Sequence, residues 1–117
     1  MRYAAAATLL FLYCSAAAIA DTGPARDVAA VRAAETAHWG SHPYGGPVRL
    51  TKARVVGDWA VLDWENGESG GMSAYHRQAN GSWKRFTSGG GAFDAHDLES
   101  LGVPAGIARQ LVPGSPG

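Results

Sequence analysis

The hydrophobic and polar positions of this chain follow three successive patterns. A nearly uninterrupted run of apolar and small residues occupies positions 3–20, directly after the basic residue Arg2. A helical period covers positions 24–39, and a period of two begins at Val48. The first pattern is typical of a targeting segment, and the other two predict a helix followed by a sheet.

The apolar run has the three parts of a secretory signal peptide. Arg2 provides the basic start, positions 9–13 form the apolar centre, and positions 18–20 (Ala-Ile-Ala) provide a cleavage motif of small residues. No basic cluster follows the run, which disfavours a retained membrane anchor. We therefore predict a signal peptide over residues 1–20 and a protein that is periplasmic or secreted.

Positions 24–39 carry the pattern of one helix of about four turns. Pro24 suits a first helical turn, and Gly40 suits a helix end. Val28, Val31, Glu35 and His38 recur between them at helical spacing, among many alanines. The resulting apolar stripe is narrow and must pack on another element.

From Val48 onward, four segments have the pattern of strands, namely 48–56, 59–65, 72–79 and 83–87. Gly57-Asp58 and Asn80-Gly81 are signals for two-residue hairpin turns, and residues 66–71 read as a longer polar turn. Connections this short require an antiparallel meander, because parallel pairing needs long crossovers.

The segment after the fourth strand predicts two short helices. Glycines 89–91 lead out of the sheet, where one stretch of backbone approaches another closely. Asp94, followed by Asp97, indicates a capped helix that ends at Leu101-Gly102. Val103-Pro104 then begins a second helix that runs through Leu111.

This order of elements defines an α+β fold, in which the N-terminal helix packs on a four-stranded antiparallel meander and two short C-terminal helices follow. We expect a single domain over residues 21–112 and a flexible tail over residues 113–117. The C-terminal helices are expected to close an edge or an end of the sheet.

Composition and charge narrow the classes of partner. Cleavage after Ala20 removes Arg2, which leaves nine Lys and Arg against ten Asp and Glu, a formal charge of −1. Such a surface has no electrostatic footprint for nucleic acid or anionic lipid. Cys14, the only cysteine, also leaves with the signal, so the domain relies on its core. We expect a protein or small-molecule partner outside the cytoplasm, and neither a nucleic acid nor a membrane.

The candidate metal ligands are His38, His42, Met72, His76 and His96. Imidazole and thioether groups suit copper or zinc. The spacing of the first two histidines fits one helix face, but Gly40 and Pro43 interrupt the helix there. No motif gathers the five residues, and ordinary packing or solvent exposure is the alternative interpretation of each.

Asp63 and Glu65 are the candidate catalytic pair. They are two positions apart on a predicted strand and therefore project from one face, a geometry compatible with acid–base catalysis. A solvated strand face is the simpler interpretation. We predict an exported non-enzymatic accessory or binding protein, with no catalytic residue and no cofactor-binding residue. The alternative is a small exported hydrolase that uses these two carboxylates.

Turn glycines and tryptophans recur between Val55 and Val112, namely in residues 56–60, Trp64, Gly67, Gly70-Gly71, Asn80-Gly81, Trp83, glycines 89–91 and residues 101–104. This pattern resembles a family of small exported bacterial proteins without an assigned biochemical activity, some of which are described as associated with copper uptake. The resemblance implies copper as the cofactor to test, with ligands from the set named above. Those relatives carry a cysteine near the end of the last strand, where this chain has Thr87-Ser88.

Overall fold

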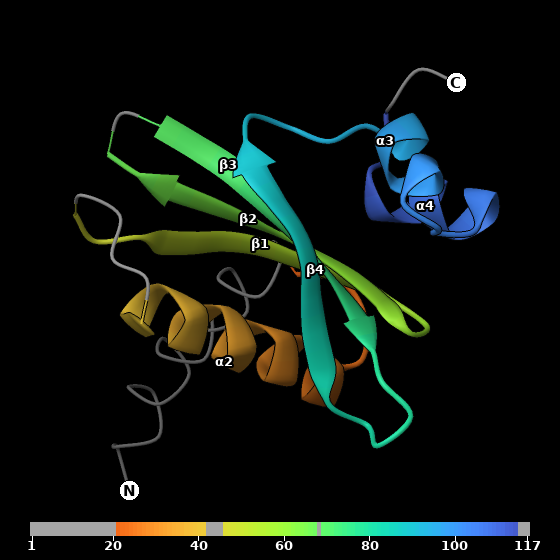
Figure 1. The fold of residues 1–117 in the computed structure, drawn as a ribbon, viewed down its shortest axis with the longest axis horizontal. Helices are drawn as coiled ribbons and strands as arrows, with labels where there is room; N and C mark the ends of the chain where they lie inside the picture. The colour runs from red at the N-terminus through yellow and green to blue at the C-terminus, as the bar shows by residue number, and fades with distance from the viewer. Residues whose placement is uncertain (1–20, 42–45, 68, 115–117) are drawn as a thin grey trace, which may run out of the picture.

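The computed structural model describes residues 21–41, 46–67 and 69–114. The predicted signal peptide, His42 and residues 115–117 lie outside this part of the chain. The elements are α2 (Ala25–Ser41), β1 (Arg49–Val56), β2 (Trp59–Asn66), β3 (Ser69–Arg77), β4 (Trp83–Gly90), α3 (Ala95–Ser100) and α4 (Ala105–Leu111). Figure 1 shows the resulting α+β fold, and the predicted fold class is confirmed.

The sheet is the predicted meander. Its four strands are hydrogen-bonded in the order β1-β2-β3-β4, and each neighbouring pair is antiparallel. Gly57 has a φ of 60°, which allows the two-residue turn between Val56 and its partner Trp59. The Asn80-Gly81 turn is longer than predicted, since Gln78 N–H donates to the carbonyl of Ser82 at 2.7 Å.

The prediction of a long turn at residues 66–71 is wrong. Asn66 already pairs with Ser69, and the pairing continues through Gly70 and Gly71. The reason is close packing of two strands: a Cβ on Gly71 would lie 2.1 Å from the carbonyl oxygen of Gly89. Gly70, Gly71, Gly89 and Gly90 are therefore strand residues, and Gly71 pairs with Gly90.

The two faces of the sheet carry separate hydrophobic cores. On one face α2 packs against the strands, through a cluster that contains Val28, Val31, Ala53, Val55, Ala60, Leu62 and Tyr75. On the other face lie α3 and α4, through a cluster that contains Val61, Met72, Ala74, Ala95, Leu98, Val103, Ala108, Leu111 and Val112. The sheet thus lies between two helical layers (Figure 1).

This arrangement corrects the expectation that the C-terminal helices close an edge or end of the sheet. The physical reason lies in β2, where successive residues are apolar and point to opposite faces. Ala60 and Leu62 face α2, whereas Val61 faces α4. Because the first half of β2, residues 59–62, is apolar on both faces, each face needs a helical cover there.

The segment before α2 covers part of the outer edge of β1. Thr22 pairs in parallel with Arg54, and its N–H donates to the carbonyl of Ala53 at 2.9 Å. The carboxylate of Asp21 accepts hydrogen bonds from Arg32 at 2.7 Å and from the N–H of Ala53 at 2.9 Å. These contacts tie the start of the domain to both the sheet and α2.

The predicted capping of α3 is confirmed. The carboxylate of Asp94 accepts from the N–H of Asp97 at 2.8 Å, and the carboxylate of Asp97 accepts from the N–H of Asp94 at 3.0 Å. Pro104 is the N-cap of α4. Within the described residues, every helix is too short or too polar to cross a bilayer.

Candidate functional site

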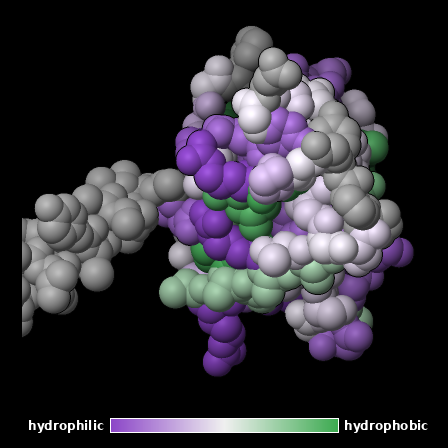
Figure 2. All heavy atoms as spheres, turned by 90° about the vertical axis from the view of Figure 1, so that its left-hand side faces the viewer, coloured by the Kyte–Doolittle hydropathy of each residue, from purple (hydrophilic) through white to green (hydrophobic). Residues whose placement is uncertain are grey.

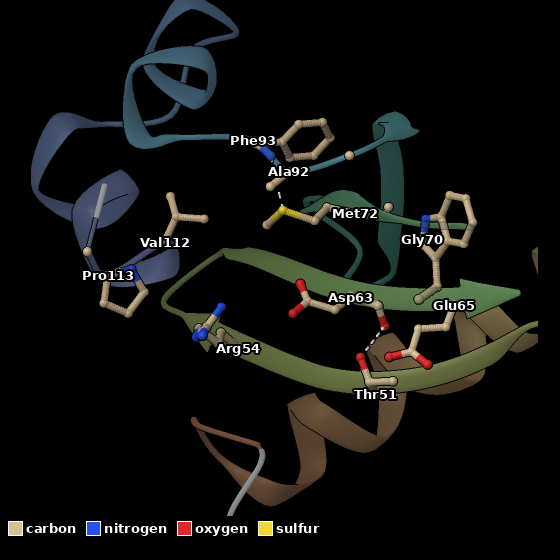
Figure 3. A pocket seen from close by; sticks show the side chains of 14 residues that line it. Thr51, Arg54, Asp63, Glu65, Gly70, Met72, Ala92, Phe93, Val112 and Pro113 are labelled. Carbon is tan, nitrogen blue, oxygen red and sulfur yellow. Dashed lines mark hydrogen bonds between the residues drawn. The ribbon is translucent and has the colours of Figure 1, made fainter. Parts of the chain in front are cut away.

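A groove with a volume of about 590 Å³ lies on the face of the sheet that α3 and α4 only partly cover. Figure 3 shows its position between the strands and the C-terminal end of the chain. Its polar side chains come from β1 and β2, namely Thr51, Arg54, Asp63 and Glu65. Its apolar wall comes from Met72, Phe93, Val112 and Pro113. Glycines 70, 71 and 91 also line it.

Asp63 is the most unusual group in the groove. It projects from the centre of β2 on the same face as Val61, and its partners on the neighbouring strands are Lys52 and Met72. Its Oδ1 atom is buried and accepts no hydrogen bond within the described part of the chain. Burial raises the pKa of the carboxyl group, and the positive charges of Arg54 and Lys52 oppose this rise only in part. The groove therefore contains a carboxylate that lacks a donor.

Arg54 lies beside Asp63 on the neighbouring strand β1 (Figure 3). Its Nη1 donates to the carbonyl oxygen of Leu111 at 3.2 Å, which ties the end of α4 to β1. The two charged side chains line one groove without forming an ion pair.

Glu65 lies at the outer end of the groove in a different environment. Its Oε1 accepts from Arg49 Nη2 at 2.6 Å, and these side chains are 49% and 75% exposed, respectively. The prediction that Asp63 and Glu65 project from one face of their strand is correct, since both line the groove. One carboxylate is half-buried without a donor, and the other forms an exposed ion pair.

The apolar wall is held together by Met72. Its sulfur accepts a hydrogen bond from the N–H of Phe93 at 3.1 Å, and its side chain is only 6% exposed. This contact fastens the segment after β4 over the sheet. Met72 thus packs in the core on the α3–α4 face of the sheet and also forms part of the groove wall.

The structure places the described metal candidates apart from one another. His38 lies near the end of α2 and packs edge-on against Trp39, with ring centroids 5.1 Å apart. His76 stacks on Trp59 at 4.0 Å on the opposite side of the sheet, and His96 is exposed on α3. Among residues 21–41, 46–67 and 69–114, no three His, Cys, Asp or Glu side chains form a group that could hold a metal ion.

Glu35, whose role was not predicted from the sequence, lies fully buried at the interface between α2 and the sheet. Its carboxylate accepts hydrogen bonds from Tyr75 Oη at 2.5 Å, Ser73 Oγ at 2.6 Å and Trp39 Nε1 at 2.8 Å. Arg85 adds an ion pair at 3.1 Å.

These partners determine the protonation of the buried network. Burial opposes ionisation of Glu35, but the hydrogen bonds from Arg85, Ser73, Tyr75 and Trp39 outweigh it and lower the pKa of the carboxyl group. Burial and the hydrogen bond to Glu35 raise the pKa of Tyr75. A signal was present in the sequence, because Glu35 continues the stripe of Val28 and Val31 and must turn its charge towards the sheet.

A smaller hollow of about 270 Å³ lies beside the His76–Trp59 stack and includes the exposed Leu101. Unlike the groove, it contains no buried polar atom without a partner among those identified in the described residues. No protein-family model, curated protein or solved structure matches this chain.

Proposed function

We propose that this chain is an exported, non-enzymatic binding protein whose ligand occupies the groove. The observation that carries the proposal is the buried Oδ1 of Asp63, which lacks a donor in a groove that also has an apolar wall. Small-molecule sites characteristically combine an apolar lining with a few convergent polar groups. The signal-peptide pattern of residues 1–20 supports export.

The surface beside the groove favours a small ligand over a large protein partner. Figure 2 shows the end of the molecule at which β2 turns into β3, and its hydrophobic residues form only narrow strips. Among the described residues, Leu101 is the only large hydrophobic side chain with high exposure. A protein interface of standard size buries about 800 Å² on each partner, commonly around an apolar centre.

The experiment is a ligand screen by NMR on ¹⁵N-labelled residues 21–117. Mixtures of small polar and zwitterionic molecules are added, and amide shifts are mapped onto the structure. We expect shifts around Asp63, Met72 and Phe93. Ala92 is an exposed residue that lines the groove, so Ala92→Trp should fill the groove and abolish the shifts.

The matched control is Ala30→Trp, which adds the same bulk at an exposed position of α2 outside the groove. Ligand shifts that survive Ala92→Trp, or that map to α2, would contradict the proposal. A screen without any groove ligand would do the same.

The raised pKa of Asp63 favours one alternative, a hydrolase. A carboxyl group that keeps its proton at higher pH can serve as a general acid, with Glu65 as the second carboxylate. The test is turnover of chromogenic ester, glycoside and phosphate substrates. Turnover that is lost in both Asp63→Asn and Glu65→Gln, with folding intact, would replace binding by catalysis as the function.

A further inference from the structure

We propose that the groove binds a small zwitterion, whose protonated amine lies against Asp63, whose carboxylate lies against Arg54, and whose apolar part lies against Met72 and Phe93. The inference rests on the proposed function and specifies the chemical class of the ligand. Apolar amino acids and dipeptides belong to this class.

The protonated amine of the proposed ligand is inferred from Asp63. A buried carboxylate oxygen without a donor carries a desolvation penalty that a hydrogen bond from a cation would remove. The side chain comes from the middle of β2 and the paired strands on both sides hold its backbone in place. A fixed acceptor of this kind suits a compact ammonium group with several N–H donors.

The carboxylate of the proposed ligand is inferred from Arg54. Its guanidinium has five N–H donors, and the described contacts use Nη1 for the carbonyl of Leu111. The remaining donors form the planar fork that matches a carboxylate. Arg54 and Asp63 line the same groove without forming an ion pair (Figure 3). A molecule with both charges would therefore give each of these side chains a partner of opposite charge.

The charge balance of the groove excludes simpler ligands. Three charged side chains line it, and Glu65 is already paired with Arg49. One anion and one cation remain, Asp63 and Arg54. A diamine would leave Arg54 without an anionic partner, and a dicarboxylate would leave Asp63 without a cationic one.

The apolar part follows from the opposite wall and the glycine rim. Met72 and Val112 are 6% and 7% exposed, and Phe93 is half-buried beside them. Gly70 and Gly91 line the groove and add no side chain to it. An aliphatic side chain of the ligand fits the apolar wall that faces these glycines.

The test uses isothermal titration calorimetry with four probes on residues 21–117. L-leucine and Leu-Leu carry both charges, N-acetylleucine lacks the amine charge, and leucinamide lacks the carboxylate. We expect at least one zwitterion to bind in the groove and each singly charged probe to bind about 10–100-fold more weakly, which corresponds to one charged hydrogen bond.

Two variants test the contacts of the two charged ends of the ligand separately. Asp63→Asn should weaken binding of the zwitterion and leucinamide but leave N-acetylleucine unchanged. Arg54→Gln should weaken binding of the zwitterion and N-acetylleucine but leave leucinamide unchanged. If Arg54→Gln unfolds because it loses the contact to Leu111, Arg54→Lys, which keeps the charge, replaces it in the experiment. Glu99→Gln, an exposed change on α3, is the control.

The outcomes distinguish this inference from the proposed function. Equal binding of leucine and leucinamide, or of leucine and N-acetylleucine, overturns the zwitterion. A groove ligand of another class from the NMR screen, together with no binding of any leucine probe, also overturns it and leaves the binding function standing. If neither experiment finds a groove ligand, both proposals fall.

Discussion

The carboxylate of Glu35 on α2 and the guanidinium of Arg85 on β4 form an ion pair with an N–O distance of 3.1 Å, although Glu35 has no exposed surface. The pair spans the interface between the helix and the sheet. Arg85 also donates to Ser73 Oγ at 2.8 Å and lies over the ring of Trp39 at 5.4 Å. One acidic residue thus links α2 to β3 and β4 through polar contacts inside an apolar interface.

Replacing Glu35 with Ala should lower the free energy of unfolding by about 3–5 kcal/mol, the usual cost of breaking a buried charge pair. The variant leaves the donors of Arg85, Ser73 and Tyr75 without their shared acceptor. Urea denaturation of residues 21–117 measures the effect, with the exposed Glu99→Gln as the control. A loss below about 1 kcal/mol would show that water or neighbouring groups replace the network.

The same carboxylate predicts how stability depends on pH. The pKa of Glu35 in the folded protein lies below its ordinary value of 4.5. Its contribution is therefore fully present above about pH 5 and is lost as pH falls through the folded pKa. Unfolding free energies measured across acid pH should fall more steeply for the wild type than for Glu35→Gln. Parallel curves for the two proteins would contradict the assignment.

The ionisation of Asp63 affects the free energy of unfolding with the opposite sign. Its folded pKa lies above its ordinary value of 3.8, so ionisation of Asp63 opposes folding at neutral pH, and protonation relieves this penalty as pH falls. Asp63→Asn should therefore leave the free energy of unfolding at pH 7 unchanged or increased, as measured by urea denaturation. A marked decrease would indicate that Asp63 stabilises the fold and would weaken its assignment to ligand binding.

Gly71→Ala should destabilise the sheet by about 1–3 kcal/mol or prevent folding. The new Cβ would lie 2.1 Å from the Gly89 carbonyl oxygen and 2.5 Å from Cζ2 of Trp64. Gly106→Ala is the matched control, because a Cβ there meets no atom within 4 Å. In the first turn of α4 this change should stabilise the protein by about 0.4–1 kcal/mol, chiefly because it reduces the conformational entropy of the unfolded chain. Thermal unfolding of both variants provides the comparison.

Copper binding by residues 21–117 is expected to be weak. His76 and His38 lie on opposite sides of the sheet, and the sulfur of Met72 already accepts a hydrogen bond from Phe93. Titration with Cu(I) and Cu(II) against a weak chelator should show no stoichiometric binding. Stoichiometric binding that is lost in His38→Ala together with His76→Ala would restore the ligand set predicted from the sequence.

The sequence predicted the elements because their signals are local. The period of two, the Gly57-Asp58 turn and the Asp94–Asp97 cap each depend on residues close together in the chain. The early start of β3 could not be predicted in this way. Its first residues include glycines that are typical of turns, and Gly71 is a strand residue that pairs with Gly90 of β4, far away in the sequence.

The candidate site was predictable only in part for the same reason. Alternation along β2 placed Asp63 and Glu65 on one face, as the groove shows. Their different surroundings come from elsewhere, since Arg49 pairs with Glu65 and the C-terminal segment encloses Asp63. Likewise, helical spacing put Glu35 on the buried stripe of α2, but its partners lie on β3 and β4.

The two cores of the sheet become complete at different points along the chain. The buried residues of the α2 core extend only from Val28 to Tyr75, whereas those of the α3–α4 core extend to Val112. A chain that emerges N-terminus first can therefore assemble one face of its sheet while the other, with Val61 and Met72, is still bare. During that interval the nascent domain exposes an apolar surface that favours aggregation. This surface is covered once α4 has emerged and packed on the sheet.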